Sequence, residues 1–334
     1  MRVSTLQVYR QATDSMMRTL GDLFRLNEQI SSGKRINKPS DDATGIARAL
    51  GYKVEISAGE QYIKNIGDAE TAISFTENTL SSVSSALARA SELAVQGANG
   101  TLDASSRSAL AAETGQLRDQ LLSLANSQLG NRYVFSGFRT DTASFDTSFA
   151  YQGDAGAVNV MIGKDTLLAQ NVSGQAAFGY TPASEEVVTL DGGEIAHYIP
   201  GAGTTVTVEI RASDDTTVLD SFSYDNAMQI ADRLTAALEA NDTRRVTALI
   251  KPLSDMASHV TDVRAVLGAR LNRLEDQADR IEDGKLSTQA SLSSVEDADI
   301  LTAASDIAKA DVALKALQAT SAKILQQSLL DFLD

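Results

Sequence analysis

The sequence predicts a mainly α-helical protein. We expect an elongated bundle of long helices whose N- and C-terminal members pair as a coiled coil, with a small β-rich domain inserted between them. Three observations lead to this fold class. Apolar side chains recur at alternating steps of three and four residues at both ends of the chain, which is coiled-coil spacing. Half of the 22 Gly residues fall between residues 130 and 203. Runs with a period of two, typical of strands, lie in the same central part.

The first helix is expected over residues 1–30. The segment SSGKRINKPSDD at 31–42 follows it as a loop, because Gly and Pro interrupt helices. We expect Ser40 to cap the next helix. Asp41 and Asp42 would then lie in its first turn, where acidic side chains are favourable.

A second helix is expected over about 43–98 and a third over about 104–128, separated by the turn sequence GANG at 97–100. The apolar stripe of the second helix keeps the steps of three and four over many turns. Its members are Ile66, Ala69, Ile73, Thr76, Leu80, Val83, Leu87, Ala90 and Ala94. A stripe of this length requires partner helices along one side.

The central segment, residues 141–224, has the periodicity of strands rather than helices. Period-two runs at 158–162, 206–210 and 218–224 predict strands, and GDAG (153–156) and SDD (213–215) are candidates for hairpin turns. The aromatic residues concentrate in this part of the chain as well. We therefore expect a β-rich insert that faces solvent.

Helical spacing returns at about 225–240, and a longer helix follows whose apolar stripe runs from Leu249 to Ile281. We expect GKLS at 284–287 to end that helix, because Gly is a weak helix former. A last helix then completes the chain.

These boundaries predict three domains. Residues 1–42 and 287–334 form the terminal coiled-coil domain. Residues 43–140 and 225–286 form the core helical bundle, and residues 141–224 form the surface-exposed insert.

Composition excludes several classes of protein. A formal net charge of -15 argues against a nucleic-acid partner or an anionic membrane surface. The chain has no Cys, which excludes disulfides and thiolate metal sites. No apolar run is long enough for a membrane span, and the N-terminal residues do not read as an ordinary secretory signal.

No catalytic, cofactor or metal site is expected. The two His residues, His197 and His259, have no spacing that pairs them with Ser and Asp in a hydrolytic triad. The acidic groups Asp41–Asp42 and Glu296–Asp297–Asp299 lack a third ligand type nearby. We interpret these acids as charges that compensate exposed N–H groups at helix N-termini.

The terminal helices carry the residues expected to form an assembly interface. Two such helices alone would be marginal in water, so we expect them to be poorly ordered in the free subunit and to fold among neighbouring subunits. The same stripes could instead be ordinary core. The interface residues are Leu6, Met16, Leu20, Leu23, Ile30, Ile300, Ile307, Leu314, Leu317 and Ile324.

Four blocks of sequence resemble the bacterial flagellin family, and they occur in order over both ends of the chain. They are SSGKRINKPSDDATGIARAL (31–50), VLGARLNRLEDQ (266–277), SSVEDADI (293–300) and KILQQSLLDFL (323–333). The start MRVST and the stretch NSQLGNRYVFSGFRTDTASF (126–145) resemble the branch of the family that joins the hook to the filament.

The resemblance implies a structural subunit of the flagellum, with no cofactor and no enzymatic activity. It would be secreted by the flagellar type III export apparatus and would lie outside the cell at the hook–filament junction. Its partners would be further copies in a ring, the other junction protein (hook-associated protein 1), flagellin and a flagellar export chaperone. A filament flagellin is the alternative, and an extracellular enzyme or an adhesin fits less well.

Overall fold

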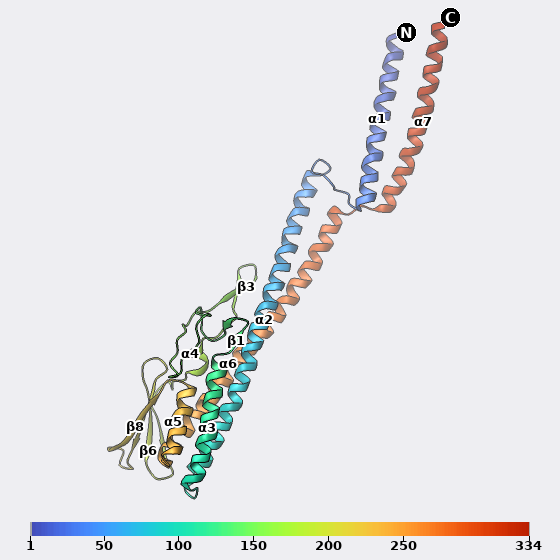
Figure 1. Ribbon diagram of the computed structural model, residues 1–334. Coiled ribbons are helices and arrows are strands. Elements are labelled where there is room, and N and C mark those ends of the chain that lie inside the picture. The colour runs from blue at the N-terminus through green and yellow to red at the C-terminus, as the bar shows by residue number, and fades with distance from the viewer. Residues whose placement is uncertain (1, 334) are drawn as a thin grey trace. The chain divides into compact units, whose positions relative to one another are not determined.

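The computed structural model describes the backbone of residues 2–333, and the side chains of residue 7 and residues 9–323. It divides into two compact units, one of residues 1–61 and 281–334 and the other of residues 62–280 (Figure 1). The α-helices are α1 (Arg2–Ser32), α2 (Ala43–Ala98), α3 (Ala104–Ala125), α4 (Gly174–Phe178), α5 (Ala227–Glu239), α6 (Thr243–Glu296) and α7 (Ile300–Leu333). The strands are β1 (Gln128–Leu129), β2 (Arg132–Tyr133), β3 (Asn159–Gly163), β4 (Thr166–Ala169), β5 (Glu186–Thr189), β6 (Ile195–Pro200), β7 (Val206–Arg211) and β8 (Val218–Tyr224).

The first unit contains the predicted terminal pair. Helices α1 and α7 lie side by side along much of their length (Figure 1). Only Leu26 and Ala303 fall below a tenth of their exposed area in this pair, among the residues whose side chains are described. In the same unit α2 and α6 approach closely, because a Cβ on Gly59 would lie 3.3 Å from Ile281 Cγ2.

The second unit contains the helical core. All nine members of the predicted α2 stripe from Ile66 to Ala94 are buried, which confirms that prediction residue by residue. Opposite them, the α6 residues Leu249, Leu253, Met256, Val260, Leu267 and Leu274 are buried as well. Helices α3 and α5 pack against each other beside this pair and supply further covering surface.

A buried guanidinium holds the turn between α2 and α3. Arg107 Nε donates to Gly97 O at 2.8 Å and Nη2 donates to Asn99 O at 2.7 Å. Its Nη1 donates to Asn241 Oδ1 at 2.6 Å, which ties this turn to the α5–α6 connection. The Arg therefore satisfies carbonyl groups that the end of α2 leaves without helical partners.

The insert is built on a four-stranded antiparallel sheet with the order β5-β6-β7-β8. Val206, Val208 and Ile210 alternate inward along β7 and are almost fully buried, as their period of two predicts. Tyr198 Oη donates to Ala248 O of α6 at 2.8 Å, so the inner face of the sheet packs on the helical core. A separate ribbon, β3 with β4, and a cluster of Phe135, Phe145 and Phe178 lie earlier in the chain than this sheet.

The predicted break at GKLS is wrong. Helix α6 continues through residues 284–287 to Glu296. A Cβ on Gly284 would meet no other atom within 4 Å, so the Gly reflects no close packing there. The cost of one Gly, about 1 kcal/mol, is too small to end a long packed helix. The chain leaves the helix only at 297–299, where Asp299 Oδ1 accepts from the N–H groups of Leu301 and Thr302 and starts α7.

Two local predictions also fail. Asp42 rather than Ser40 caps α2, because Asp42 Oδ1 accepts from Gly45 N at 2.8 Å. The GDAG segment is not a hairpin turn. Asp154 Oδ1 instead accepts from Phe138 N and Gly156 N. This contact requires Gly at position 137, where φ is +69° and a Cβ would lie 2.2 Å from the Asp154 carboxylate. The SDD turn is confirmed between β7 and β8.

Candidate assembly surfaces

The predicted interface residues pack mainly within the chain. Side chains of Met16, Leu20, Leu23 and Ile30 on α1 are half-buried, as are Ile307, Leu314 and Leu317 on α7. Ile300 lies at the start of α7 and is 55% exposed, outside the covered part of the seam. Leu6 and Ile324 lie outside the residues with described side chains. The stripe is therefore an internal seam that the two helices cover only in part.

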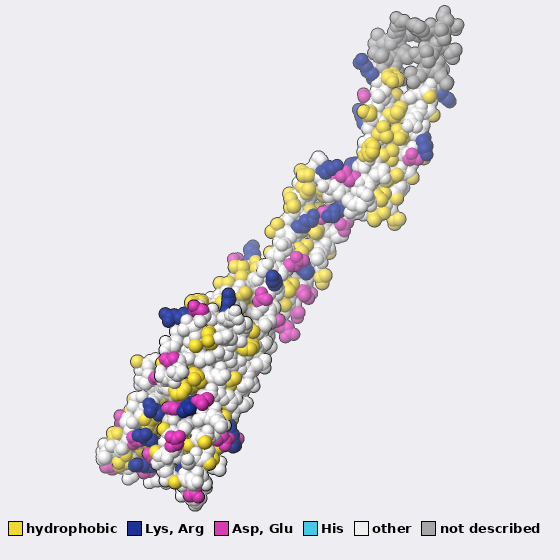
Figure 2. Space-filling view, in the orientation of Figure 1, with side chains coloured by type: hydrophobic (Ala, Val, Ile, Leu, Met, Phe, Trp, Pro, Cys, Tyr) yellow, Lys and Arg dark blue, Asp and Glu magenta, His cyan; other side chains and the backbone are white. Residues whose placement is uncertain are grey.

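A second set of apolar side chains points away from this seam. Phe24 is 74% exposed and Met17 is 68% exposed on α1, one heptad apart. On α7, Leu301 is 85% exposed and Val312 is 66% exposed. Figure 2 shows hydrophobic side chains gathered along this pair of helices. The predicted stripe of each helix does not include this outer set, although the i, i+7 spacing of Met17 and Phe24 is visible in the sequence.

The connections that lead into the terminal helices are bonded to each other. Lys34 forms an antiparallel β-bridge with Asp297. Arg35 N donates to Glu296 O at 2.7 Å, and Ala298 N donates to Gly33 O at 2.9 Å. We call residues 33–36 and 295–298 the joint.

Glu296 is the buried charge of the joint. Its Oε1 lies 2.8 Å from Lys34 Nζ and 2.7 Å from Lys53 Nζ, and its side chain is only 9% exposed. Burial raises the pKa of Glu296, but the hydrogen bonds and charges of the two lysines outweigh it and lower the pKa on balance. The hydrogen bond that Lys34 donates to Glu296 raises the pKa of Lys34 in turn.

The acidic groups thus play separate parts. Asp42 and Asp299 bind N–H groups at helix N-termini, as expected for acids at those ends. Glu296 does not, because it is the last residue of α6. Sequence spacing could not distinguish Glu296 from the other acids, because its two partners are distant in the chain. Lys34 is 262 positions away and Lys53 is 243 positions away.

The two His residues have structural partners. His197 Nδ1 lies 2.6 Å from Glu185 Oε1, and its Nε2 lies 2.6 Å from Asp215 Oδ1. With carboxylates at both ring nitrogens, no nitrogen remains to act as a base toward a Ser hydroxyl. His259 Nε2 lies 2.8 Å from Ala176 O, and its ring contacts Tyr180.

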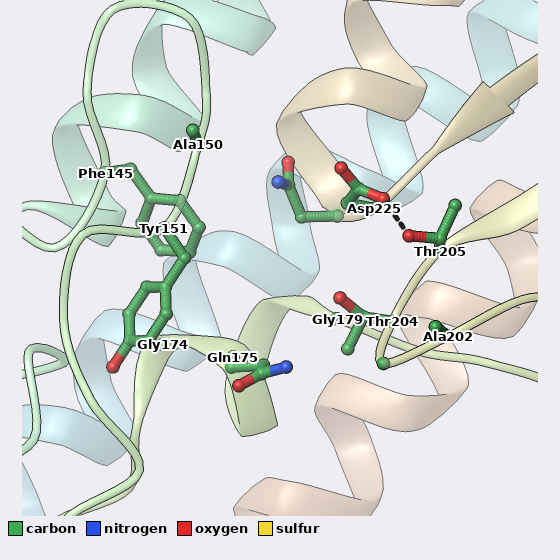
Figure 3. A pocket seen from close by; sticks show the side chains of 12 residues that line it. Phe145, Ala150, Tyr151, Gly174, Gln175, Gly179, Ala202, Thr204, Thr205 and Asp225 are labelled. Carbon is green, nitrogen blue, oxygen red and sulfur yellow. Dashed lines mark hydrogen bonds between the residues drawn. The ribbon is translucent and has the colours of Figure 1, made fainter.

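A cavity of about 380 Å³ lies in the insert between the 145–151 loop, α4 and the 202–205 turn (Figure 3). Its one carboxylate, Asp225, accepts a hydrogen bond from Thr205 Oγ1 at 2.6 Å. The Asn226 side chain caps α5 and donates to Phe149 O. Asp225 and Asn226 therefore form hydrogen bonds with the protein around the cavity. The cavity lining contains no second carboxylate and no His, Lys or Arg.

Within the described residues, no cluster of three or more His, Asp and Glu side chains could hold a metal ion. None of the described helices is both long enough and apolar enough to cross a membrane.

Comparison with known proteins defines the class of protein. The model of the bacterial flagellin N-terminal helical region matches residues 3–140, and that of the C-terminal helical region matches residues 250–333. The two matches span more than half of the chain, so it belongs to the bacterial flagellin family. This family consists of structural flagellar subunits rather than enzymes, and its members assemble with other subunits of the flagellum.

Individual relatives point to one branch of this family. The flagellar hook-associated protein 3 of Escherichia coli (strain K12) is 30% identical over 301 residues, which cover 90% of this chain and 89% of that protein. The flagellin of Listeria innocua is 26% identical over 98% of this chain and 96% of its own. The crystal structure of hook-associated protein 3 from Legionella pneumophila shares the fold, with a TM-score of 0.57 at 22% identity over 73% of this chain and 98% of that one.

Proposed function

We propose that this chain is the structural subunit that joins the flagellar hook to the filament. The observation that carries the proposal is the similarity to hook-associated protein 3 along almost the whole chain, at a higher identity than to the Listeria flagellin. The fold supplies a matching physical basis. A paired set of terminal helices with apolar side chains on two faces can bury further area only against other subunits.

The mechanism is helix–helix packing. Half-buried seam residues such as Leu314 and Leu317 complete their burial when neighbouring terminal helices cover them, and the outer residues Phe24 and Leu301 make the new contacts. Burial of this apolar area is the driving force, because exposed ion pairs contribute only about 0–1 kcal/mol each. The neighbours are further copies in a ring, hook-associated protein 1 on the hook side and flagellin on the filament side.

The subunit reaches this position by export through the flagellar apparatus, with an export chaperone before secretion. The three-domain division fits this role. Residues 1–42 and 287–334 would make the inner contacts, residues 43–140 and 225–286 the surrounding wall, and residues 141–224 the outer surface.

Immunogold electron microscopy of intact flagella tests the proposal, with antibody to residues 141–224. A single band where the hook meets the filament is expected. Label along the whole filament would make the chain a filament flagellin, which the Listeria relative supports as the second candidate. Flagella without label would overturn both.

The outer apolar set has its own test. Phe24→Ser removes an exposed ring and should change the stability of the free subunit by less than about 0.5 kcal/mol. Secretion should remain normal while incorporation at the junction falls. Thr13→Ala, at an exposed position of the same helix, is the control. Normal incorporation of the Phe24 variant would contradict a role for the outer face.

A further inference from the structure

Two connections that are far apart in the sequence form one structure in the first unit. The α1–α2 connection and the α6–α7 connection share the bridge of Lys34 with Asp297 and the two backbone hydrogen bonds that flank it, Arg35 N to Glu296 O and Ala298 N to Gly33 O. Arg35 adds a third link, since its Nη2 donates to Val295 O at 2.7 Å. Both terminal helices therefore leave from the same bonded segment.

We propose that Glu296 is the positioning residue of this joint, and that its contacts with Lys34 and Lys53 hold the two terminal helices to α2 and α6 as a single body. The carboxylate links all three segments, because Lys34 belongs to the α1–α2 connection, Lys53 to α2, and Glu296 to the end of α6. Any effect of this joint on assembly at the junction rests on the proposed function. Its effect on how the terminal helices are held in the free subunit does not.

The position of Glu296 argues that its charge has a specific task. A carboxylate at the C-terminal end of a helix is unfavourable, because that end of the helix dipole carries a partial negative charge. It is also largely removed from water, and a buried charge is unfavourable unless it is paired. Both costs disappear only when the lysines are in place, so the folded joint and the two ion pairs depend on each other.

A second ion pair in the same unit shows how an exposed pair differs from the buried pairs of Glu296. Lys38 Nζ lies 2.8 Å from Glu28 Oε2, a similar distance, but the two side chains are 61% and 43% exposed. Water can replace either partner of that pair. At Glu296, with 9% exposure, water has little access, and loss of both lysines would leave the carboxylate without a cationic partner.

The proposal predicts that removing the charge opens the joint. Glu296→Gln keeps the shape of the side chain and removes its charge, and Lys34→Met with Lys53→Met removes the cations. A second double variant, Lys34→Arg with Lys53→Arg, keeps both positive charges. Glu282→Gln, at an exposed position of the same helix, is the matched control.

Hydrogen exchange of the full-length free subunit is the first measurement. The amides of Arg35 and Ala298, which donate across the joint, should exchange at least about tenfold faster in Glu296→Gln and in the double Met variant. They should be unchanged in the double Arg variant and in Glu282→Gln. Amides of the α2 stripe at 66–94 report whether the variant is folded. Unchanged exchange at Arg35 and Ala298 in a folded Glu296→Gln variant would overturn the proposal.

Spin-label distances test the single body directly. The chain has no Cys, so Asp14→Cys on α1 and Glu55→Cys on α2 give one unique label pair. In contrast to the expectation from sequence that the terminal helices are poorly ordered in the free subunit, the distance distribution should be narrow in the otherwise unmodified chain. It should become broad after Glu296→Gln. A broad distribution in both chains, or a narrow one in both, would overturn the proposal. None of these measurements depends on where the subunit lies in the flagellum, so failure here is distinct from failure of the immunogold test.

Discussion

The terminal pair and the helical core have the same sequence pattern but different burial. Stripe residues of the core such as Ile73, Leu80 and Leu87 are 0% exposed. Equivalent residues of the terminal pair, Leu20, Leu314 and Leu317, remain half-buried. The core stripe is covered because α3, α5 and a sheet lie around α2 and α6, whereas in the described part of the chain α1 packs mainly against α7. The difference teaches that spacing defines a face, and the number of covering elements determines how much of it is buried.

The largest effect on stability is expected in the core. Leu87→Ala leaves a cavity in a fully covered site and should lower the free energy of unfolding by about 2–5 kcal/mol. Leu314→Ala, at a half-buried site of the terminal pair, should cost about 1 kcal/mol. Guanidinium unfolding followed by circular dichroism measures both. Equal losses would show that the two regions are buried alike in solution.

A charge in the terminal seam should act on assembly more than on the fold. Leu317→Asp places a carboxylate where neighbouring subunits would exclude water, which is unfavourable for an unpaired charge. We expect normal secretion and loss of the junction, measured by motility and by electron microscopy of flagella. Gln318→Asp, on the exposed side of the same helix turn, is the control. Normal motility of the Leu317 variant would argue that this seam is only internal.

The joint should depend on pH at both extremes. The pKa of Glu296 is lowered on folding, so its contribution is present above its unfolded pKa and is lost as the pH falls through the folded value. The pKa of Lys34 is raised above its ordinary 10.5, so its contribution is present below that value and is lost as the pH rises through the folded one. Protection factors of Arg35 and Ala298, corrected for intrinsic exchange, should be highest between these limits. Protection factors that do not change from acid to alkaline pH would show that the stability of the joint does not depend on the charges of Glu296 and Lys34.

The smallest effect is expected at Gly284, and it is stabilising. The Gly lies in the interior of α6 with open space around its Cβ position. Gly284→Ala should raise the free energy of unfolding by about 0.5–1 kcal/mol through helix propensity. Gly97→Ala is the contrasting variant, because its Cβ would lie 2.4 Å from Leu238 Cδ2. Destabilisation by Gly284→Ala would indicate a packing contact at this face.

Local patterns predicted most of the elements. The α2 stripe, the strands β3, β7 and β8, and the return to helix at α5 all follow from periodicity, because one face of each is buried and the other is not. The helix boundaries near GKLS and Ser40 were wrong because small local preferences compete there with packing and with a better cap. Strands β5 and β6 were missed because their Gly- and Pro-containing surroundings hide the alternation.

The candidate surfaces were predicted less completely than the fold. The seam of α1 and α7 was expected from spacing, and its use between subunits stays a prediction. The contacts of Glu296 could not have been predicted, because they depend on where three segments meet. The same holds for Arg107, whose partners Asn99 and Asn241 lie on two connections at the end of the core.

The sequence by itself determined the long helices and the strands β3, β7 and β8, the apolar face of each, and the family that the chain resembles, since these depend on neighbours a few positions apart. Only the tertiary structure decided how deeply each face is buried, where α6 ends, and that a glutamate at the end of that helix joins Lys34 and Lys53. Burial and charge pairing depend on segments brought together from opposite ends of the chain, and a one-dimensional pattern does not record which segments meet.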